Sequence, residues 1–335
     1  MSLGQHMLRA WYDDAAWLAA LRPLEMIYRG AMRRREVAYA SGRKPVWRAP
    51  VPVIVVGNIT LGGTGKSPLV AWLGRYLSEH GWRPGLLSRG YGGSSEGYPL
   101  QVTRDTPVTQ CGDEALMLVG QTGLPMVVDP DRPRGARALV EAGCDILISD
   151  DGLQHLALAR DLELVVVDGA RGVGNGRCLP AGPLREPIDR LARVDAVIVN
   201  GTPHRPLPVA GHTMHLEPSR WRRVMDDTPS SLTPLPFTAP VHALAGIGHP
   251  VRFFATLESL GIDYTPHPFA DHHAFGADDL RFSDSRPIVM TAKDAVKCQA
   301  FADSRCWALD VEACPAPAFV AWFAQRVEAL SARTP

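Results

Sequence analysis

The sequence has little that would mark a protein for nucleic acid, secretion or passage through a membrane. Its 35 Lys and Arg residues balance 35 Asp and Glu residues, so net charge gives no argument for a nucleic-acid partner. No stretch reaches the ~18 consecutive apolar residues of a spanning helix, and no signal sequence opens the chain. The cysteines include no CxxC pair, which indicates a reducing compartment and thiols that mostly pack: Cys111, Cys144, Cys178, Cys298, Cys306 and Cys314. We therefore expect a cytoplasmic protein, and the sequence implies no protein partner.

A glycine-rich loop between a strand and a helix organises the sequence. The run VPVIVVGNITLGGTGKSPLVAWL, from Val51 to Leu73, has the order that a phosphate-binding loop requires. Lys66 would reach the β- and γ-phosphates, and the Ser67 hydroxyl would sit on Mg²⁺. The usual pattern has glycine where this chain has Thr60, and the plainer alternative is a turn before an ordinary helix. We predict a nucleotide loop of eight residues: Thr60, Leu61, Gly62, Gly63, Thr64, Gly65, Lys66 and Ser67.

The alternation of strands and helices from Val51 onward predicts an α/β fold with a parallel sheet covered on both faces. A length of 335 residues suits two domains. We expect a P-loop NTPase-like doubly wound sheet over 49–200, a proline-rich connector over 201–237, and a second, smaller Rossmann-like α/β domain over 238–335. In that second domain the pair Gly246 and Gly248 precedes a helix without a phosphate-binding lysine, so we interpret it as tight packing.

Acidic residues supply the second half of a nucleotide site. The apolar strand after Cys144 ends in Asp150 and Asp151, which places carboxylates beside the loop, where they would hold Mg²⁺ directly or through water. The two should point in different directions, so one can serve the metal while the other holds a loop or substrate. The pair Asp113-Glu114 either begins a helix or enters the site as base and metal ligand.

Polar residues also follow other strand ends, where open α/β sheets bind ligands. Arg89 and Tyr91, in the segment SRGYGG, suit an anionic group, although simple turn chemistry is the alternative. Gln154 and His155 follow the acidic strand end. His155 could transfer a proton, but a lone histidine is more often a structural hydrogen-bonding group.

Residues 169–187 are rich in glycine and proline, and we interpret them as a projecting hairpin or lid that is too hydrophilic to be buried. At the end of this stretch, Arg185 and Glu186 could clamp a phosphate or simply pair with each other.

Two classes of nucleotide-binding protein compete: a small-molecule or lipid kinase, and an ATPase or switch that acts on a partner. A kinase needs a group that takes the proton of the acceptor hydroxyl, whereas a switch only positions a water. Asp113 and the Asp271-His272 pair are candidates for that group.

Residues 1–48 are basic and carry aromatic and aliphatic side chains at helical spacing: Trp11, Tyr12, Trp17, Leu18, Leu21, Leu24, Ile27 and Tyr28. Such a helix can lie in a bilayer interface, attracted to anionic headgroups. It can equally pack on the core of the protein with a solvated arginine face, and this stretch alone leaves both interpretations open.

Taken together, these motifs resemble the tetraacyldisaccharide 4'-kinase family, the lipid A kinases of Gram-negative bacteria. The resemblance covers nearly the whole chain and rests on segments in the order of the family: VPVIVVGNITLGGTGKSP, SRGYGG, GDEALML, DPDRPRGA, SDDGLQH, GARGVGNGRCLPAGPLREP, FADHH and MTAKDAVKC. Thr60 agrees with the family, whose loop also lacks the first glycine. Ala292 departs from it, because relatives are expected to carry Glu there, which puts in doubt any contact of that side chain.

The resemblance implies an enzyme that transfers the γ-phosphoryl group of ATP to the 4'-hydroxyl of a tetraacylated glucosamine disaccharide 1-phosphate at the cytoplasmic face of the inner membrane. It implies Asp113 as the catalytic aspartate, assisted by His272, with Lys66 at the phosphates. It places Mg²⁺ and phosphate contacts at Ser67, Glu114, Asp150 and Asp151. The residues that we expect to bind the acceptor substrate are Arg89, Tyr91, Gln154, His155 and Arg185. Because acyl chains stay in the bilayer, the N-terminal segment should dock on the membrane surface.

Overall fold

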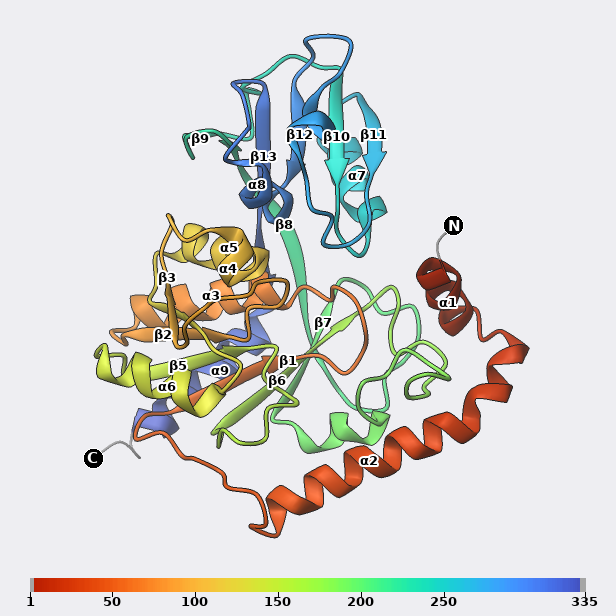
Figure 1. The fold of residues 1–335 in the computed structure, drawn as a ribbon, viewed down its shortest axis with the longest axis vertical. Coiled ribbons are helices and arrows are strands. Elements are labelled where there is room, and N and C mark those ends of the chain that lie inside the picture. Colours follow the sequence, from red (N-terminus) through yellow and green to blue (C-terminus); the bar gives the residue numbers. More distant parts are fainter. Residues whose placement is uncertain (1–2, 332–335) are drawn as a thin grey trace.

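The structure, a computed structural model, describes residues 3–331 and contains a parallel sheet in its first part (Figure 1). The strands of this part are β1 (Val53–Gly57), β2 (Pro84–Ser88), β4 (Met126–Val128), β5 (Ile146–Asp150), β6 (Leu162–Asp168) and β7 (Ala196–Asn200), with β3 (Leu100–Val102) antiparallel at the edge. Strand β1 lies between β5 and β6 and is buried along its whole length. That burial is the reason for its unbroken β-branched run, since central parallel strands are covered on both faces.

Helices cover both faces of this sheet, which confirms the predicted doubly wound α/β fold. They are α3 (Lys66–Glu79), α4 (Val108–Cys111), α5 (Asp113–Thr122), α6 (Arg132–Glu141) and the short 3-10 helix η2 (Ile188–Arg193). On one face, Leu69 of α3 packs in a cluster with Ile54; on the other, Leu139 of α6 packs with Val53. Successive residues of β1 point to opposite faces, so one strand anchors both layers.

The second part is smaller and again parallel, as the sequence predicts. It consists of β10 (Val241–Ala245), β11 (Tyr264–Pro268), β12 (Ile288–Thr291), α7 (Pro250–Ser259), α8 (Ala292–Cys298) and the 3-10 helix η3 (Ala277–Leu280). Figure 1 shows this part standing above the first, with a long strand running between them.

That connection is an antiparallel ribbon of β8 (His212–Arg223) and β13 (Cys306–Pro315), with β9 (Pro229–Ser230) beside β8. It joins the two parts into one sheet of order β11-β10-β12-β13-β8-β7-β6-β1-β5-β2-β4-β3. From the sequence alone we predict shorter strands here, His212–Leu216 and Cys306–Leu309, and both extend further in the structure. The predicted domain over 238–335 also fails to account for α9 (Pro317–Ser331), whose Phe319 and Phe323 pack against Trp72 of α3 in the first part.

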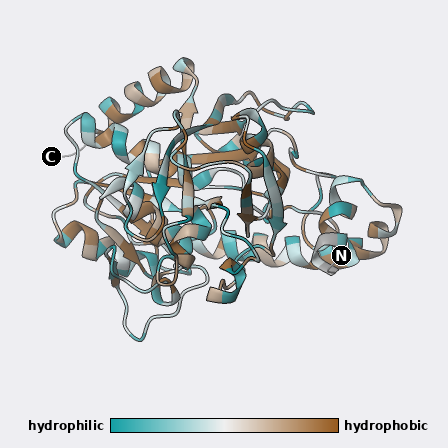
Figure 2. Ribbon diagram, turned by 90° about the horizontal axis from the view of Figure 1, so that it is seen from above, coloured by the Kyte–Doolittle hydropathy of each residue, from teal (hydrophilic) through white to brown (hydrophobic). Residues whose placement is uncertain are grey.

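The N-terminal segment forms three helices, α1 (Leu3–Tyr12), η1 (Ala16–Leu21) and α2 (Arg22–Ala40), which extend to one side of the sheet in Figure 2. Both interpretations of this segment find support in its burial. Trp11 and Leu18 are buried, whereas Leu24, Met26 and Ile27 are 53%, 74% and 69% exposed. Among the described residues, no helix has the length and apolar character needed to cross a bilayer.

Residues 169–187 do not project as a hydrophilic hairpin, and that expectation is wrong. Cys178, Ala181 and Leu184 are buried, and Leu184 forms an isolated bridge with Thr60 of the glycine-rich loop. Cys178 and Leu184 pack in a cluster with Ile59, whereas Leu179 packs against the cluster of Trp11 and Leu18, so the polar composition of the stretch hides its buried side.

Candidate active site

The glycine-rich loop closes around the N-terminus of α3, which begins at Lys66. Gly62 and Gly65 adopt φ values of 93° and 96°, in the region that favours glycine. A Cβ at Gly65 would lie only 2.5 Å from Asn200 Nδ2, so this position also lacks the space for a side chain. The loop therefore turns its backbone toward the positive end of the helix dipole, as a phosphate site requires.

Lys66 is held over this loop by two polar side chains from neighbouring strand ends. Its Nζ lies 3.2 Å from Asn58 Oδ1 and 3.6 Å from Asp151 Oδ1. Ser67 follows in the first turn of α3 and is buried. The order of strands 6-1-5 brings the acidic end of β5 beside the loop that leaves β1, although about ninety residues separate them.

Asp150 and Asp151 occupy different environments, as the sequence predicts. Asp150 is fully buried, and within the described part of the chain neither of its carboxylate oxygens has a hydrogen-bond partner. Burial and then the negative charge of Glu114 raise the pKa of Asp150 to about 7. Burial would also raise the pKa of Asp151, but the charges of Lys66 and Arg185 outweigh it and lower that pKa to about 2.

The donor set beside the loop fits Mg²⁺. Asp150 offers a buried carboxylate without a partner among residues 3–331, and Ser67 offers a hydroxyl on the adjacent helix turn. Hard cations such as Mg²⁺ take oxygen ligands of these types, and a bound cation would offset the unfavourable burial of the Asp150 charge.

Asp113 and His272 lie together although 159 residues separate them in the sequence: His272 Nδ1 is 3.1 Å from Asp113 Oδ2. Asp113 begins α5, as one of the two interpretations of the sequence expects, and its carboxylate is buried against His272. Burial would raise the pKa of Asp113, but the hydrogen bond with His272 and the charge of Lys293 lower it. The same hydrogen bond raises the pKa of His272.

Lys293, at the start of α8, connects the remaining charged groups. Its Nζ lies 3.2 Å from Glu114 Oε1, 3.4 Å from His272 Nε2 and 3.7 Å from Asp271 Oδ1. Glu114 is thus tied to the second part of the fold. Ala292 is buried beside Lys293 and lines a cleft that the glycine-rich loop also lines. The Glu expected at this position in relatives would therefore stand at the wall of that cleft.

Arg185 pairs with the acidic strand end and not with Glu186. Its guanidinium donates to Asp151 at 3.0 and 3.1 Å, to Asn58, and to Gln154. Gln154 in turn donates to Glu186. The predicted substrate residues Gln154 and Arg185 therefore brace the loop around Asp151, and we infer that they position it.

The remaining predicted substrate residues line one cleft of about 1000 Å³, shared with the glycine-rich loop. Arg89 is exposed there, and Tyr91 is 66% exposed with its ring 4.9 Å from that of His272. His155 is partly buried, and its pKa is lowered to about 3 by burial and then by the charge of Arg132. A histidine that resists protonation in this way favours the structural interpretation over proton transfer.

Sequence reasoning missed a buried arginine that the structure brings to this cleft. Arg132 begins α6 and is completely buried, and its Nη2 donates to the Asp150 carbonyl at 2.8 Å. In the described chain its Nε and Nη1 have no partner, and burial lowers its pKa to about 10. The only sequence feature at this position is the segment DPDRPRGA, which by itself predicts a polar turn.

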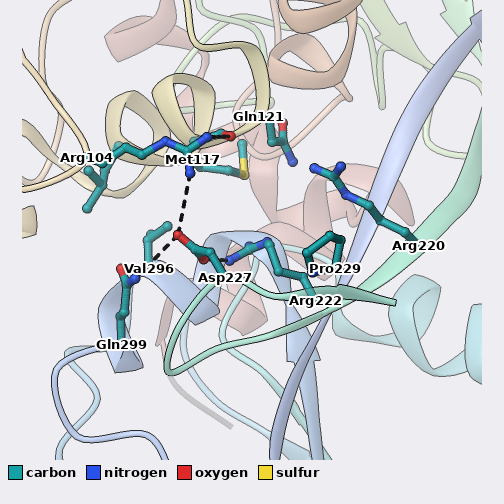
Figure 3. Close-up of a pocket in the computed structure, with 11 residues that line it drawn as sticks. Arg104, Met117, Gln121, Arg220, Arg222, Asp227, Pro229, Val296 and Gln299 are labelled. Carbon is teal, nitrogen blue, oxygen red and sulfur yellow. Dashed lines mark hydrogen bonds and ion pairs between the residues drawn. The ribbon is translucent and has the colours of Figure 1, made fainter. Parts of the chain in front are cut away.

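A second cavity, of about 220 Å³, lies behind the contact between α5 and α8 (Figure 3). Figure 3 shows Arg104 from the first part pointing at Asp227, which Arg222 of β8 also contacts. The Arg104 pair is long, at 3.9 Å, and largely exposed, so it adds little to the association of the two parts.

The comparisons with known proteins identify one family. A family model described as "Tetraacyldisaccharide-1-P 4'-kinase" matches residues 17–328. A tetraacyldisaccharide 4'-kinase of Pseudomonas aeruginosa is 50% identical over 334 residues, which cover 99% of this chain and 100% of the relative. One from Alkalilimnicola ehrlichii is 54% identical over 318 residues, covering 95% and 94% respectively.

Among solved structures, a crystal structure of LpxK from Aquifex aeolicus in complex with ATP is similar throughout. It has a TM-score of 0.79 and 26% sequence identity, and the match covers 94% of this chain and 99% of that one. The similarity therefore extends over both parts of the fold and the ribbon between them.

Proposed function

This chain belongs to the tetraacyldisaccharide 4'-kinase family, and we propose that Asp113 is the base with which it phosphorylates the 4'-hydroxyl of an acylated glucosamine disaccharide 1-phosphate. The chain is a kinase of lipid A biosynthesis, like the relatives that it matches over almost all of its length. The observation that carries the proposal is the hydrogen bond of 3.1 Å between Asp113 and His272, because His272 lines the same cleft as the glycine-rich loop.

Asp113 would accept the proton of the 4'-hydroxyl as the hydroxyl oxygen bonds to the γ-phosphorus. The bond between the γ-phosphorus and the oxygen that it shares with the β-phosphate breaks, and ADP leaves. The lowered pKa of Asp113 supports this role, because a base must be ionised at neutral pH before it can take a proton. His272 would orient the carboxylate through Nδ1. Lys293, which lies near both His272 and Glu114, would hold these two side chains in place.

ATP would lie with its phosphates in the loop of residues 60–67, where Lys66 offsets the charge that builds up during transfer. We propose that Ser67, Glu114 and Asp150 hold Mg²⁺, while Asp151 stays with Lys66 and Arg185. When bound, the metal would supply positive charge that offsets the charge of the phosphates. Arg89 and Tyr91 would contact the acceptor, because both are exposed at the cleft.

We further propose that the enzyme works at the cytoplasmic face of the inner membrane, with its N-terminal helices on the bilayer surface. Each acyl methylene withdrawn from the bilayer costs ~0.8 kcal/mol, so the enzyme should reach the lipid at the interface. The exposed Leu24, Met26 and Ile27, among the arginines of α2, support this placement.

The test is transfer of label from γ-labelled ATP to purified tetraacyldisaccharide 1-phosphate in detergent. The wild-type chain should label the lipid, Asp113→Asn should lower turnover by ~10²–10⁴-fold while still binding ATP, and Lys66→Ala should lose ATP-dependent turnover. Turnover that barely changes in Asp113→Asn would exclude the carboxylate as base. Phosphate released without an acceptor would point to an ATPase or a nucleotide switch.

A further inference from the structure

Arg171 lies directly over the glycine-rich loop, although the segment that contains it, GARGVGNGRCLPAGPLREP, does not by itself predict this place. It belongs to the turn segment that follows β6, and its Nη2 donates to the Gly63 carbonyl. A Cβ at Gly62 would come within 2.9 Å of Arg171 Nη1, so the guanidinium approaches the loop at a point where only glycine leaves room. The side chain is only 11% exposed.

The Nη1 end of the Arg171 guanidinium lacks an acceptor among the residues that the structure describes. Arg171 Nη1 is also buried. Leaving a buried cationic donor unpaired is unfavourable. The neighbouring Thr64 Oγ1, on the same loop, is likewise buried and without a partner there. An anion bound by the loop would supply the acceptor that Nη1 does not find among the described residues.

The opposite edge of Arg171 is anchored by Asp168, at the end of β6. Asp168 Oδ2 accepts from Arg171 Nε at 3.3 Å and from Arg252 Nη2 at 3.0 Å, and Oδ1 accepts the backbone N–H of Arg171 at 3.2 Å. Asp168 is only 2% exposed. The anchor fixes the Nε edge and leaves Nη1 facing the loop.

Charge also favours an anion at this position. Two guanidinium groups share the single Asp168 carboxylate, so the cluster carries one net positive charge beside the loop. Arg252 comes from α7 of the second part, and Tyr12 of α1 lies with its ring centre 5.9 Å from Arg171 Cζ. The cluster therefore draws on three separate elements to hold one arginine in place.

We propose that Arg171 binds a phosphate oxygen of ATP through Nη1, as a cation of the nucleotide site in addition to Lys66, and that Asp168 is its positioning residue. This inference rests on the proposed function, since it requires a triphosphate in the loop of residues 60–67. The planar fork of arginine suits this role, because Nε can stay on the carboxylate while an Nη group reaches the phosphate.

The test compares Arg171→Gln, Arg171→Lys and the matched control Arg177→Gln by equilibrium binding of ATP and by steady-state kinetics. Arg177 lies in the same segment but pairs with Glu25, away from the loop. Arg171→Gln should raise the Kd and KM for ATP at least tenfold and leave the KM for the lipid acceptor within twofold. Arg171→Lys should recover part of the loss, and Arg177→Gln should bind ATP like the wild type.

ATP affinity within twofold of wild type in Arg171→Gln, or an Arg171→Lys variant as impaired as Arg171→Gln, would overturn the inference. Equal rises in both KM values together with a lower melting temperature would instead show that Arg171 only fastens its segment. Failure of the proposed function is distinguishable, because then Lys66→Ala would also leave ATP binding unchanged.

Discussion

Asp113 combines two properties that ordinarily oppose each other. Burial disfavours a charged carboxylate, yet a base must be charged before it reacts. The structure resolves this with His272 and Lys293, whose hydrogen bond and positive charge keep the pKa of Asp113 below its ordinary value in spite of burial. The carboxylate that we propose as the base is therefore kept ionised by residues of the second part of the fold.

This dependence predicts a change in the pH profile. His272→Ala removes an interaction that lowers the pKa of Asp113, so the folded-state pKa of Asp113 should rise. The acid limb of the kcat profile should then move to higher pH, so activity should fall earlier than in the wild type as the pH is lowered. Steady-state kinetics across the acid and neutral range measure this.

His273→Ala is the matched control, because His273 pairs with Asp279 at 3.1 Å and not with Asp113. Its acid limb should coincide with that of the wild type. A His272→Ala variant whose activity falls by the same factor at every pH would show that His272 does not act through the ionisation of Asp113.

At the scale of the element, two glycines of the glycine-rich loop differ in how strongly the backbone requires them. Gly65 has a positive φ, and a Cβ built there would lie 2.5 Å from Asn200 Nδ2. A Cβ built at Gly63 would have no described atom within 4 Å. The left-handed conformation costs a residue with a Cβ about 1–2 kcal/mol. Of these two, only Gly65 is therefore required by the fold of the unliganded loop.

Gly65→Ala should lower the melting temperature of the unliganded protein and abolish ATP binding, because Asn200 and the loop must move apart. Gly63→Ala should melt like the wild type. Differential scanning calorimetry with and without ATP makes both comparisons. Equal melting temperatures for Gly65→Ala and wild type would mean that the loop relaxes without strain.

The N-terminal helices make a second prediction at this scale. Met26 and Ile27 are among the most exposed large hydrophobic residues, and burial of such side chains contributes about 1.5–3 kcal/mol each. The double variant Met26→Ser/Ile27→Ser should lower binding to anionic vesicles at least tenfold in a sedimentation assay. Val251→Ser, at a residue that is 66% exposed on α7, should bind vesicles normally. If the double variant binds vesicles as well as the wild type, the N-terminal helices pack on the protein and do not bind the membrane through these residues.

At the scale of the whole molecule, the two parts share one sheet through β8 and β13 and meet again across the cleft. Contacts between Asp113 and His272, Glu114 and Lys293, and Asp168 and Arg252 all join the first part to the second. We infer that the parts close over ATP and the lipid, which would exclude water as a competing acceptor.

Closure predicts that ATP protects both sides of the cleft. A Cβ at Gly248 would lie 3.5 Å from Gly63 N, so the loop of residues 246–250 faces the phosphate loop. Hydrogen–deuterium exchange should slow at residues 60–67 and also at 246–250 when ATP is added. Strand β3, at the sheet edge, should exchange as before. Slowing at the phosphate loop alone would contradict closure.

The features predicted best from the sequence are those that a short segment specifies. The strand β1, the glycine-rich loop and α3 follow from a β-branched run, glycines and helical periodicity within one stretch. The length of β8 was missed, because its burial alternates irregularly and Pro218 interrupts it. The buried side of residues 169–187 was missed for a similar reason, since its apolar residues are sparse and meet only in three dimensions.

The sequence by itself determined the family, the glycine-rich loop before α3 and the acidic end of β5, because each depends on neighbours along the chain. Only the tertiary structure decided which partners the charged residues have. In the tertiary structure, His272 hydrogen-bonds to Asp113, and Arg185 hydrogen-bonds to Asp151 rather than to Glu186. Arg171 donates to the carbonyl of Gly63 in the loop. The physical reason is that charges act over a few ångströms through space, and distance along the chain does not fix that separation.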